Sequence, residues 1–234
     1  MAHQEYKYIL LTELGQGGWR LQLNDVAKRN ALSEVLVDEC LLAIRTLPSE
    51  TCLLVVAGDD LAFCSGMDRS VLSHGGEALI SLNHKIGELL YTIHSLPFCV
   101  VGVMDGPAVG GGVGLMMACD WLVATPKATM KLPEWSLGVF PEQIWPYCTR
   151  RVNHADLMSS LLWGTCHHAS WLLDAGWVDH VVESGRIGEY VLQWLNQLVN
   201  QSPYLMRRFK VLTKLNVDAK EKSIVFSHVN DGFV

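Results

Sequence analysis

The sequence contains no CxxC pair, although it holds seven cysteines. Most of them lie inside apolar runs, and they stand at positions 40, 52, 64, 99, 119, 148 and 166. An odd number of scattered cysteines without metal-ligand spacing argues against a disulfide framework and against a zinc site. We therefore expect buried, reduced thiols, no bound metal and a cytoplasmic protein.

The chain also lacks a surplus of basic residues and a long hydrophobic run. Its 18 Lys and Arg are outnumbered by 24 Asp and Glu, and its net charge is −6. This balance argues against a general nucleic-acid binder, which needs cations to neutralise phosphates. The N-terminus has no basic start before an apolar stretch, and the longest apolar runs are too short or too rich in glycine to span a bilayer. We expect neither a secretory signal nor a membrane partner.

Strand-like and helix-like segments alternate along the first two thirds of the chain. Of the 234 residues, 50% are hydrophobic, which is enough for one sizeable core. Continuous apolar runs that suit strands buried on both faces lie at 52–57, 99–104 and 121–124. Helical spacing of apolar residues lies at 33–47 and 77–95. A glycine-rich turn at 15–18 joins two expected hairpin strands, 6–14 and 19–24. The alternation predicts the α/β class with a parallel sheet.

After about residue 153 the pattern becomes helical. Apolar residues recur at three- and four-residue spacing in the segments 155–163, 186–200, 203–215 and 219–229. We find no linker and no repeat of fixed period. The sequence therefore predicts an α/β core over residues 1–185, followed by a helical C-terminal region over residues 186–234.

Two glycine-containing turns follow buried strands and are candidates for binding a negative charge. The first lies at 62–68, and the second, at 110–114, precedes a predicted helix whose first N–H groups are unpaired. Two such donors converging from separate turns would form an oxyanion hole for a thioester enolate. A tight packing turn remains the alternative for the second segment. A dinucleotide-binding GxGxxG motif is excluded because Leu115 stands where its third glycine belongs.

Six motifs, in this order and at these spacings, resemble the crotonase family, also called the enoyl-CoA hydratase/isomerase family. They are KRNAL at 28–32, AFCSGMD at 62–68, DGPAVGGG at 105–112, CDWLVAT at 119–125, MKLPE at 130–134 and AGWVDHVV at 175–182. The resemblance implies a crotonase-like spiral of ββα turns with a helical C-terminal trimerisation region. It further implies a homotrimer or hexamer, no metal or redox cofactor, and an acyl thioester of CoA or of an acyl carrier protein as substrate.

The same resemblance implies roles for individual residues. The backbone N–H groups of Met67 and Gly111 fall at the two oxyanion positions, and Glu134 falls at the position of a carboxylate that transfers a proton. The residues that match the CoA-binding and oxyanion-loop segments are Lys28, Arg29, Ala31, Ser65, Gly66, Asp68 and Gly110.

One departure from the family pattern bears on the reaction. Gly114 stands where the hydratases of the family carry the first of their two glutamates. A single carboxylate suffices to move a proton between two carbons of an enolate, and it works best when burial raises its pKa toward neutrality. We therefore expect enoyl isomerisation or dehydration/hydration with one glutamate. The alternatives are decarboxylation of a glutaconyl-like thioester in polyketide β-branching, and a non-catalytic homologue that binds thioesters or serves as a scaffold.

Two further residues carry alternatives. Glu142 replaces a glycine of the family pattern, and it is either a substitute acid or a surface residue at the start of a helix. His228 lies on the last predicted helix, where some decarboxylases and carbon–carbon bond-forming members of the family place a histidine. The plainer interpretation of His228 is an ordinary helical histidine.

Aromatic and basic side chains near these positions also allow two interpretations each. Trp135, Phe140 and Trp145 either wall an acyl pocket or pack in the core. Lys210 and Lys214 lie four residues apart on a predicted helix. Such a pair belongs by default to a solvated face, with contacts to CoA phosphates as the alternative.

Overall fold

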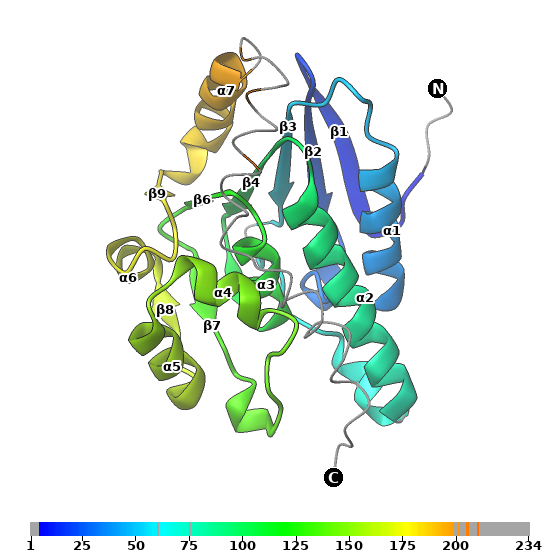
Figure 1. Ribbon diagram of the computed structural model, residues 1–234, viewed down its shortest axis with the longest axis vertical. Coiled ribbons are helices and arrows are strands. Elements are labelled where there is room, and N and C mark those ends of the chain that lie inside the picture. Colours follow the sequence, from blue (N-terminus) through cyan, green and yellow to red (C-terminus); the bar gives the residue numbers. More distant parts are fainter. Residues whose placement is uncertain are drawn as a thin grey trace.

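The structure is a computed structural model that describes residues 5–59, 61–74 and 76–198, together with residues 201, 205 and 210. Figure 1 shows helices packed around a twisted sheet, which confirms the predicted α/β class. The strands form a six-stranded sheet in the order β1-β2-β3-β4-β6-β9 and a three-stranded sheet in the order β5-β7-β8.

The larger sheet is parallel except for its first pair of strands. Its members are β1 (Ile9–Gly15), β2 (Gly18–Leu23), β3 (Leu53–Ala57), β4 (Cys99–Met104), β6 (Trp121–Ala124) and β9 (His180–Val181). The hairpin of β1 and β2 turns through Gly15, Gln16 and Gly17, all with positive φ, a conformation that glycine adopts at little cost. Every residue of β3 and β4 is buried, as continuous apolar runs predict for strands covered on both faces.

The smaller sheet brings the two candidate turns together. It consists of β5 (Pro107–Val109), β7 (Thr129–Lys131) and β8 (His167–His168). Two isolated parallel bridges extend it, one between Cys64 and Ala108 and one between Leu32 and Met67. The segments 62–68 and 107–111 therefore lie next to each other, although 40 or so residues separate them in the chain.

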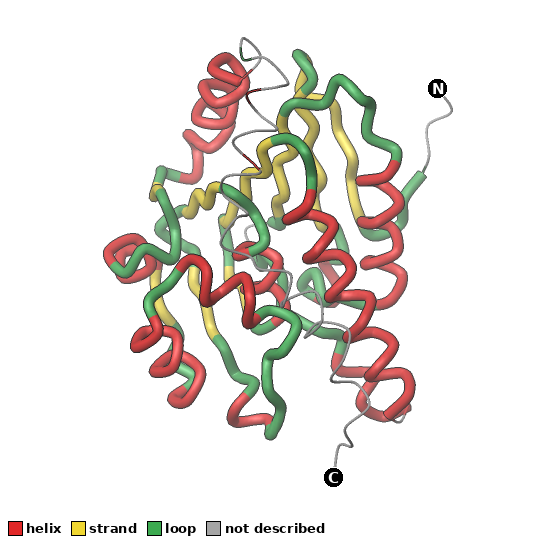
Figure 2. Tube along the Cα trace, viewed as in Figure 1, coloured by secondary structure: helices red, strands yellow, loops and turns green. Residues whose placement is uncertain are grey.

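Helices cover both faces of the larger sheet (Figure 2). They are α1 (Glu34–Arg45), α2 (Gly76–Ser95), α3 (Gly111–Met117), α4 (Trp145–Arg151), α5 (His154–Trp163), α6 (Ala169–Asp174) and α7 (Ile187–Leu198). α1 begins where the Ser33 side chain accepts a hydrogen bond from the Leu36 N–H, the usual cap of an unpaired first turn. α1 and α2 pack on one face of the sheet, and α7 packs on the other through Val191 and Leu195.

The C-terminal region is described only in part. α7 confirms the helix predicted at 186–200, whereas the segments predicted at 203–215 and 219–229 lie almost wholly outside the described residues. The solvated position predicted for Lys210 is wrong, because the residue is 1% exposed and its ammonium lies 2.7 Å from Asp120 Oδ1. No helix among the described residues is long and apolar enough to cross a membrane.

Candidate active site

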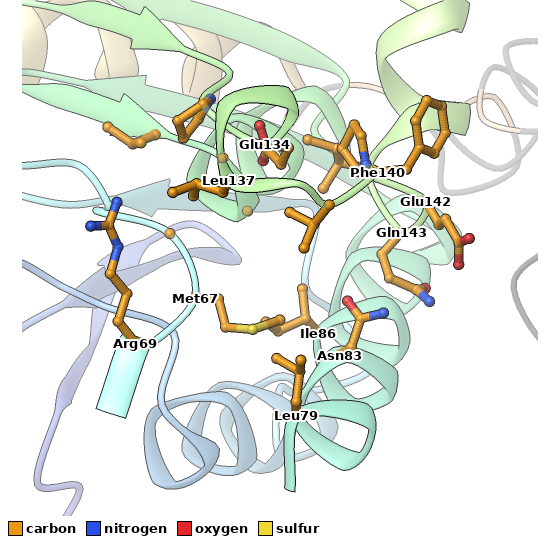
Figure 3. A pocket seen from close by; sticks show the side chains of 18 of the residues that line it. Met67, Arg69, Leu79, Asn83, Ile86, Glu134, Leu137, Phe140, Glu142 and Gln143 are labelled. Atoms are coloured by element: carbon orange, nitrogen blue, oxygen red, sulfur yellow. The ribbon is translucent and has the colours of Figure 1, made fainter. Parts of the chain in front are cut away.

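A cavity of about 320 Å³ lies between α2, the two candidate turns and the loop that leads into α4. Eight of the residues singled out from the sequence line it together, and they are Ser65, Gly66, Met67, Gly110, Gly111, Glu134, Phe140 and Glu142. Most of its other lining side chains are apolar, which Figure 3 shows around the labelled Met67, Ile86 and Leu137. An apolar pocket with a few convergent polar groups is typical of a binding site for a small molecule.

Two backbone N–H groups point toward the same place in this cavity. The bridge between Leu32 and Met67 uses the Gly66 carbonyl and the Asp68 N–H, which leaves the Met67 N–H on the opposite side of the strand. Gly111 begins α3, so its N–H belongs to the unpaired first turn. Within the described part of the chain, neither N–H has a hydrogen-bond acceptor.

The glycines at this place keep the two donors close together. A Cβ added to Gly111 would lie 3.8 Å from the Met67 nitrogen, and a Cβ added to Gly66 would lie 3.6 Å from the Gly111 nitrogen. Gly66 has a φ of +88° and would also meet the Val109 carbonyl oxygen at 2.7 Å. The pair therefore has the arrangement of an oxyanion hole, in which preorganised donors face a developing negative charge.

The segment 28–32 holds the first of these turns in place. The Ser65 N–H donates to the Arg29 carbonyl and the Ser65 hydroxyl donates to the Lys28 carbonyl, each at 3.0 Å. Asn30 is fully buried with a left-handed backbone, and its amide donates to the Ala62 carbonyl at 2.9 Å. These bonds fix the turn that carries Met67.

A charged contact strengthens the same connection. The Lys28 ammonium lies 2.7 Å from Asp68 Oδ2, and the Ser70 N–H donates to Asp68 Oδ1 at 3.0 Å. Burial opposes ionisation of Asp68, but the hydrogen bonds from Lys28 and Ser70 outweigh it and lower the pKa of this carboxyl. Lys28, Arg29, Ala31 and Asp68 do not line the cavity, so what the structure shows of them is support for the turn.

Glu134 enters the cavity beside the second donor. Gly110 has a φ of +52°, and a Cβ added there would lie 2.7 Å from Glu134 Oε1. The other oxygen, Oε2, is buried and has no hydrogen-bond partner among the described residues. Burial raises the pKa of Glu134 to about 7. A carboxyl with this pKa is present in both protonation states near neutral pH, as a residue that removes and returns a proton requires.

The chain that carries this geometry matches a known protein family over most of its length. The family model described as enoyl-CoA hydratase/isomerase matches residues 15–229. The chain belongs to this family. The predicted membership in the crotonase superfamily is thereby confirmed, and the protein is an enzyme of the hydratase/isomerase type.

Individual relatives of this crotonase agree. An enoyl-CoA isomerase/hydratase of Mycosarcoma maydis is 24% identical over 217 residues, which cover 87% of this chain and 79% of the relative. The structure of AtuE from Pseudomonas aeruginosa is 30% identical, covers 88% of this chain and 82% of its own, and has a TM-score of 0.81. An enoyl-CoA hydratase from Bacillus halodurans shares the fold with a TM-score of 0.87 at 20% identity, covering 94% of this chain and 91% of its own.

Among the described residues, no second carboxylate lies beside Glu134 in the crotonase site. Position 114, where the sequence resemblance places the first hydratase glutamate, is a buried glycine on α3. A Cβ added to Gly114 would overlap the Ile144 side chain and would lie 3.2 Å from Leu90 Cδ1. The volume near position 114 is therefore already filled by apolar side chains.

Glu142 does not replace that carboxylate at the centre of the site. It lines the outer part of the cavity, is exposed, and precedes α4 by three residues. Figure 3 shows its carboxylate turned away from Glu134. His228 lies outside the described residues.

Of the three aromatic residues near Glu134, two take one predicted role each and Trp135 takes neither. Phe140 lines the cavity and its ring lies 5.2 Å from that of Trp145, which packs against the core. Trp135 is 57% exposed and does not line the cavity. Only Phe140 thus walls the pocket directly.

The sequence analysis did not predict one wall of the cavity. It comes from α2 and from the loop before α4, and it consists of Leu79, Ile80, Asn83, Ile86, Leu137, Val139, Gln143 and Ile144, with Arg69 at the opposite side. Positions 79, 83 and 86 have the spacing of one helix face, which is a usable signal. That face is nonetheless indistinguishable in sequence from a face packed into the core.

Two buried thiols lie near the candidate site. The backbone of Cys64 contacts Gly112, and burial raises the pKa of the Cys64 thiol to about 12. Burial also raises the pKa of the Cys148 thiol, with a further contribution from the nearby charge of Glu134. Among the described residues no group of three or more His, Cys, Asp or Glu is placed to hold a metal ion.

Proposed function

We propose that this crotonase isomerises an enoyl thioester, moving a double bond along the acyl chain with Glu134 as its single acid–base residue. The observation that carries the proposal is a buried carboxyl with a pKa of about 7 beside two N–H groups that have no acceptor among the described residues. The apolar filling around position 114 further supports proton transfer between carbons over the addition of water, since no second carboxylate is available there to activate a water molecule.

The proposed reaction has two proton transfers. Ionised Glu134 removes a proton from C2 of a 3-enoyl thioester, and the electron pair moves into the thioester carbonyl. The N–H groups of Met67 and Gly111 stabilise the oxygen of the resulting dienolate. Protonated Glu134 then returns the proton to C4, which gives the conjugated 2-enoyl thioester. No atom is gained or lost, so one carboxyl is sufficient.

A substrate panel tests this proposal. The protein is incubated with 2-enoyl, 3-enoyl, 3-hydroxyacyl and glutaconyl CoA thioesters in D2O, and the products are read by mass. We expect interconversion of the 2-enoyl and 3-enoyl thioesters, with deuterium incorporated only as far as protonated Glu134 exchanges its proton with the solvent. Release of CO2 from the glutaconyl thioester alone would replace the proposal with the decarboxylase, and binding without turnover of any thioester would replace it with the non-catalytic homologue.

The proposal also covers the carrier of the acyl group and the oligomeric state of the protein. The same panel on acyl carrier protein shows whether the pantetheine arm is accepted on CoA, on the carrier or on both.

We also propose a homotrimer or hexamer, because large apolar side chains remain exposed on the isolated chain, including Trp163 at 79%. Light scattering at micromolar concentration tests the assembly, and a monomeric mass would contradict it.

A further inference from the structure

Beyond the candidate reacting groups, the cavity continues as an apolar space between α2 and the loop that precedes α4. Its α2 wall contains Leu79, Ile80 and Ile86, and the wall across from it contains Leu137 and Val139. Figure 3 shows Leu79 and Ile86 on one side of this space and Leu137 on the other. Because the transfer of apolar surface from water to such walls is favourable, the group that fits this space is a hydrocarbon chain.

The apolar side chains become more buried toward one end of the space. Ile86 is 2% exposed and Ile144 is 4% exposed, so these two residues form the inner end. Leu79 and Ile80, near the start of α2, are only partly buried, and Leu137 in the opposite wall is 54% exposed. A bound chain would therefore have apolar contacts from the inner end to the opening, and it would cover side chains that now face water.

The polar side chains of the lining offer little to a second polar group on the acyl chain. Four of them remain partly accessible to water, and they are Ser65, Arg69, Asn83 and Glu142. Gln143 is buried, but a Cβ added to Gly87 would overlap the end of its side chain, so its carboxamide packs against α2. Among the described lining residues, the buried polar group that remains is the carboxyl of Glu134, which the proposed proton transfer already uses.

The volume of the cavity restricts the length of the chain. An apolar cavity of about 150 Å³ holds benzene, which has six carbons. On the same scale, the cavity of about 320 Å³ holds roughly twelve non-hydrogen atoms. The oxygen and the sulfur of the thioester account for two of these atoms, which leaves room for roughly ten acyl carbons.

We propose that the preferred substrate of this crotonase is an enoyl thioester with an unsubstituted hydrocarbon chain of about eight to ten carbons. The distal part of the chain packs between α2 and the loop before α4, and Ile86 at the inner end limits its length. The inference rests on the proposed function, because it takes Glu134 and the two N–H donors to hold the reacting end. It goes beyond that function by naming a substrate class and a residue that determines specificity.

Binding of saturated acyl-CoA thioesters tests the inference without requiring turnover. Chains of four to sixteen carbons are compared by calorimetry. We expect binding to tighten about two- to fourfold with each added CH2 up to about ten carbons, and then to level off because further carbons stay in water. Tightest binding at four carbons, or tightening that continues unchanged to sixteen carbons, would overturn the inference.

Two variants and a matched control locate the chain. Ile86→Ala removes three carbons from the inner wall and should move the levelling-off point to chains about two carbons longer. Leu82→Ala is the control, because Leu82 is equally buried on the same helix but does not line the cavity, and it should leave that point unchanged. Leu79→Ala changes a partly exposed residue, so it should fold, and it should weaken binding of decanoyl-CoA about fivefold and that of butyryl-CoA less than about twofold.

The outcomes separate this inference from the proposed function. Equal shifts in Ile86→Ala and Leu82→Ala, or equal weakening of both thioesters in Leu79→Ala, would overturn the inference. Isomerisation of 3-enoyl-CoA is measured separately. A length preference without isomerisation would contradict only the proposed function, and isomerisation without a length preference would contradict only the inference.

Discussion

Ile144 occupies the space into which a side chain at Gly114 would extend. The two residues belong to different elements, since Gly114 lies on α3 and Ile144 immediately precedes α4. The two positions cannot both hold large side chains, because a larger residue at one position requires a smaller residue at the other. The space that a glutamate at position 114 would need is therefore filled by the wall that faces it.

This packing predicts the effect of restoring the carboxylate. Gly114→Glu alone should lower stability by about 1–3 kcal/mol, the usual cost of overpacking a core, and add no hydratase activity. The double variant Gly114→Glu, Ile144→Gly should recover part of that stability and raise the rate of water addition to 2-enoyl-CoA. Thermal unfolding and a hydration assay measure both effects.

A matched control for this variant exists on α7. A Cβ added to Gly188 would meet nothing within 4 Å, so Gly188→Glu should change the melting temperature little. If Gly114→Glu alone were as stable as Gly188→Glu, the packing argument would be wrong.

Glu134→Gln tests the assignment of the proton-transferring residue. The change keeps the size of the side chain but removes its proton acceptor, and it should lower kcat at least about a hundredfold. In the natural protein kcat/KM for isomerisation should rise with pH around a midpoint near 7, because the ionised carboxyl removes the first proton. A rate unchanged in Glu134→Gln, or a larger loss in His228→Ala, would contradict the single-glutamate mechanism.

The same carboxyl should also make stability depend on pH. The pKa of Glu134 is raised from 4.5 to about 7, so between these values the folded protein binds a proton that the unfolded chain has released. The favourable contribution of the protonated form is therefore complete below pH 4.5 and is lost as pH rises to about 7. At pH 8 Glu134→Gln should be more stable than the natural protein, by at most about 3 kcal/mol. Denaturant unfolding at pH 5 and pH 8 measures the difference, and a Glu134→Gln stability gain of equal size at both pH values would refute this account.

Gly111→Val tests the oxyanion hole. A Cβ at this position would lie 3.0 Å from Leu32 Cδ1 and 3.8 Å from the Met67 nitrogen, so the two donors should be pushed out of alignment. Loss of one such donor costs about 3 kcal/mol of transition-state stabilisation, which is about a hundredfold in kcat. Steady-state kinetics of Gly111→Val are compared with those of Gly185→Val, because Gly185 has nothing within 4 Å of an added Cβ. Full activity in a folded Gly111→Val would remove the assignment.

The strongest sequence signals were local in nature, and the structure confirms them. The strands at 99–104 and 121–124 have the predicted bounds, since continuous apolar runs that end at polar residues define buried strands. The strands β5, β7 and β8 have three residues or fewer and depend on pairing between distant segments, which no periodicity records. They nevertheless form the sheet to which the bridge between the two candidate turns belongs.

The positions of individual side chains in the site were harder to predict from the sequence. Glu134 and the two backbone donors were identified because they lie in ordered motifs. The filling of position 114 by Ile144 and the contact of Gln143 with Gly87 are contacts between separate elements. Lys210 illustrates the same limit, because its partner Asp120 is 90 residues away and a charge pattern alone indicates a solvated face.

The burial of Cys64 and Cys148 has a consequence for the durability of the enzyme. Conjugated enoyl thioesters are Michael acceptors, and they alkylate thiolates far more readily than thiols. Both cysteines lie near the candidate site, and burial raises the pKa of each thiol well above its usual value, which favours the protonated form. Packing thus protects the protein from covalent inactivation by the electrophile that it is proposed to produce.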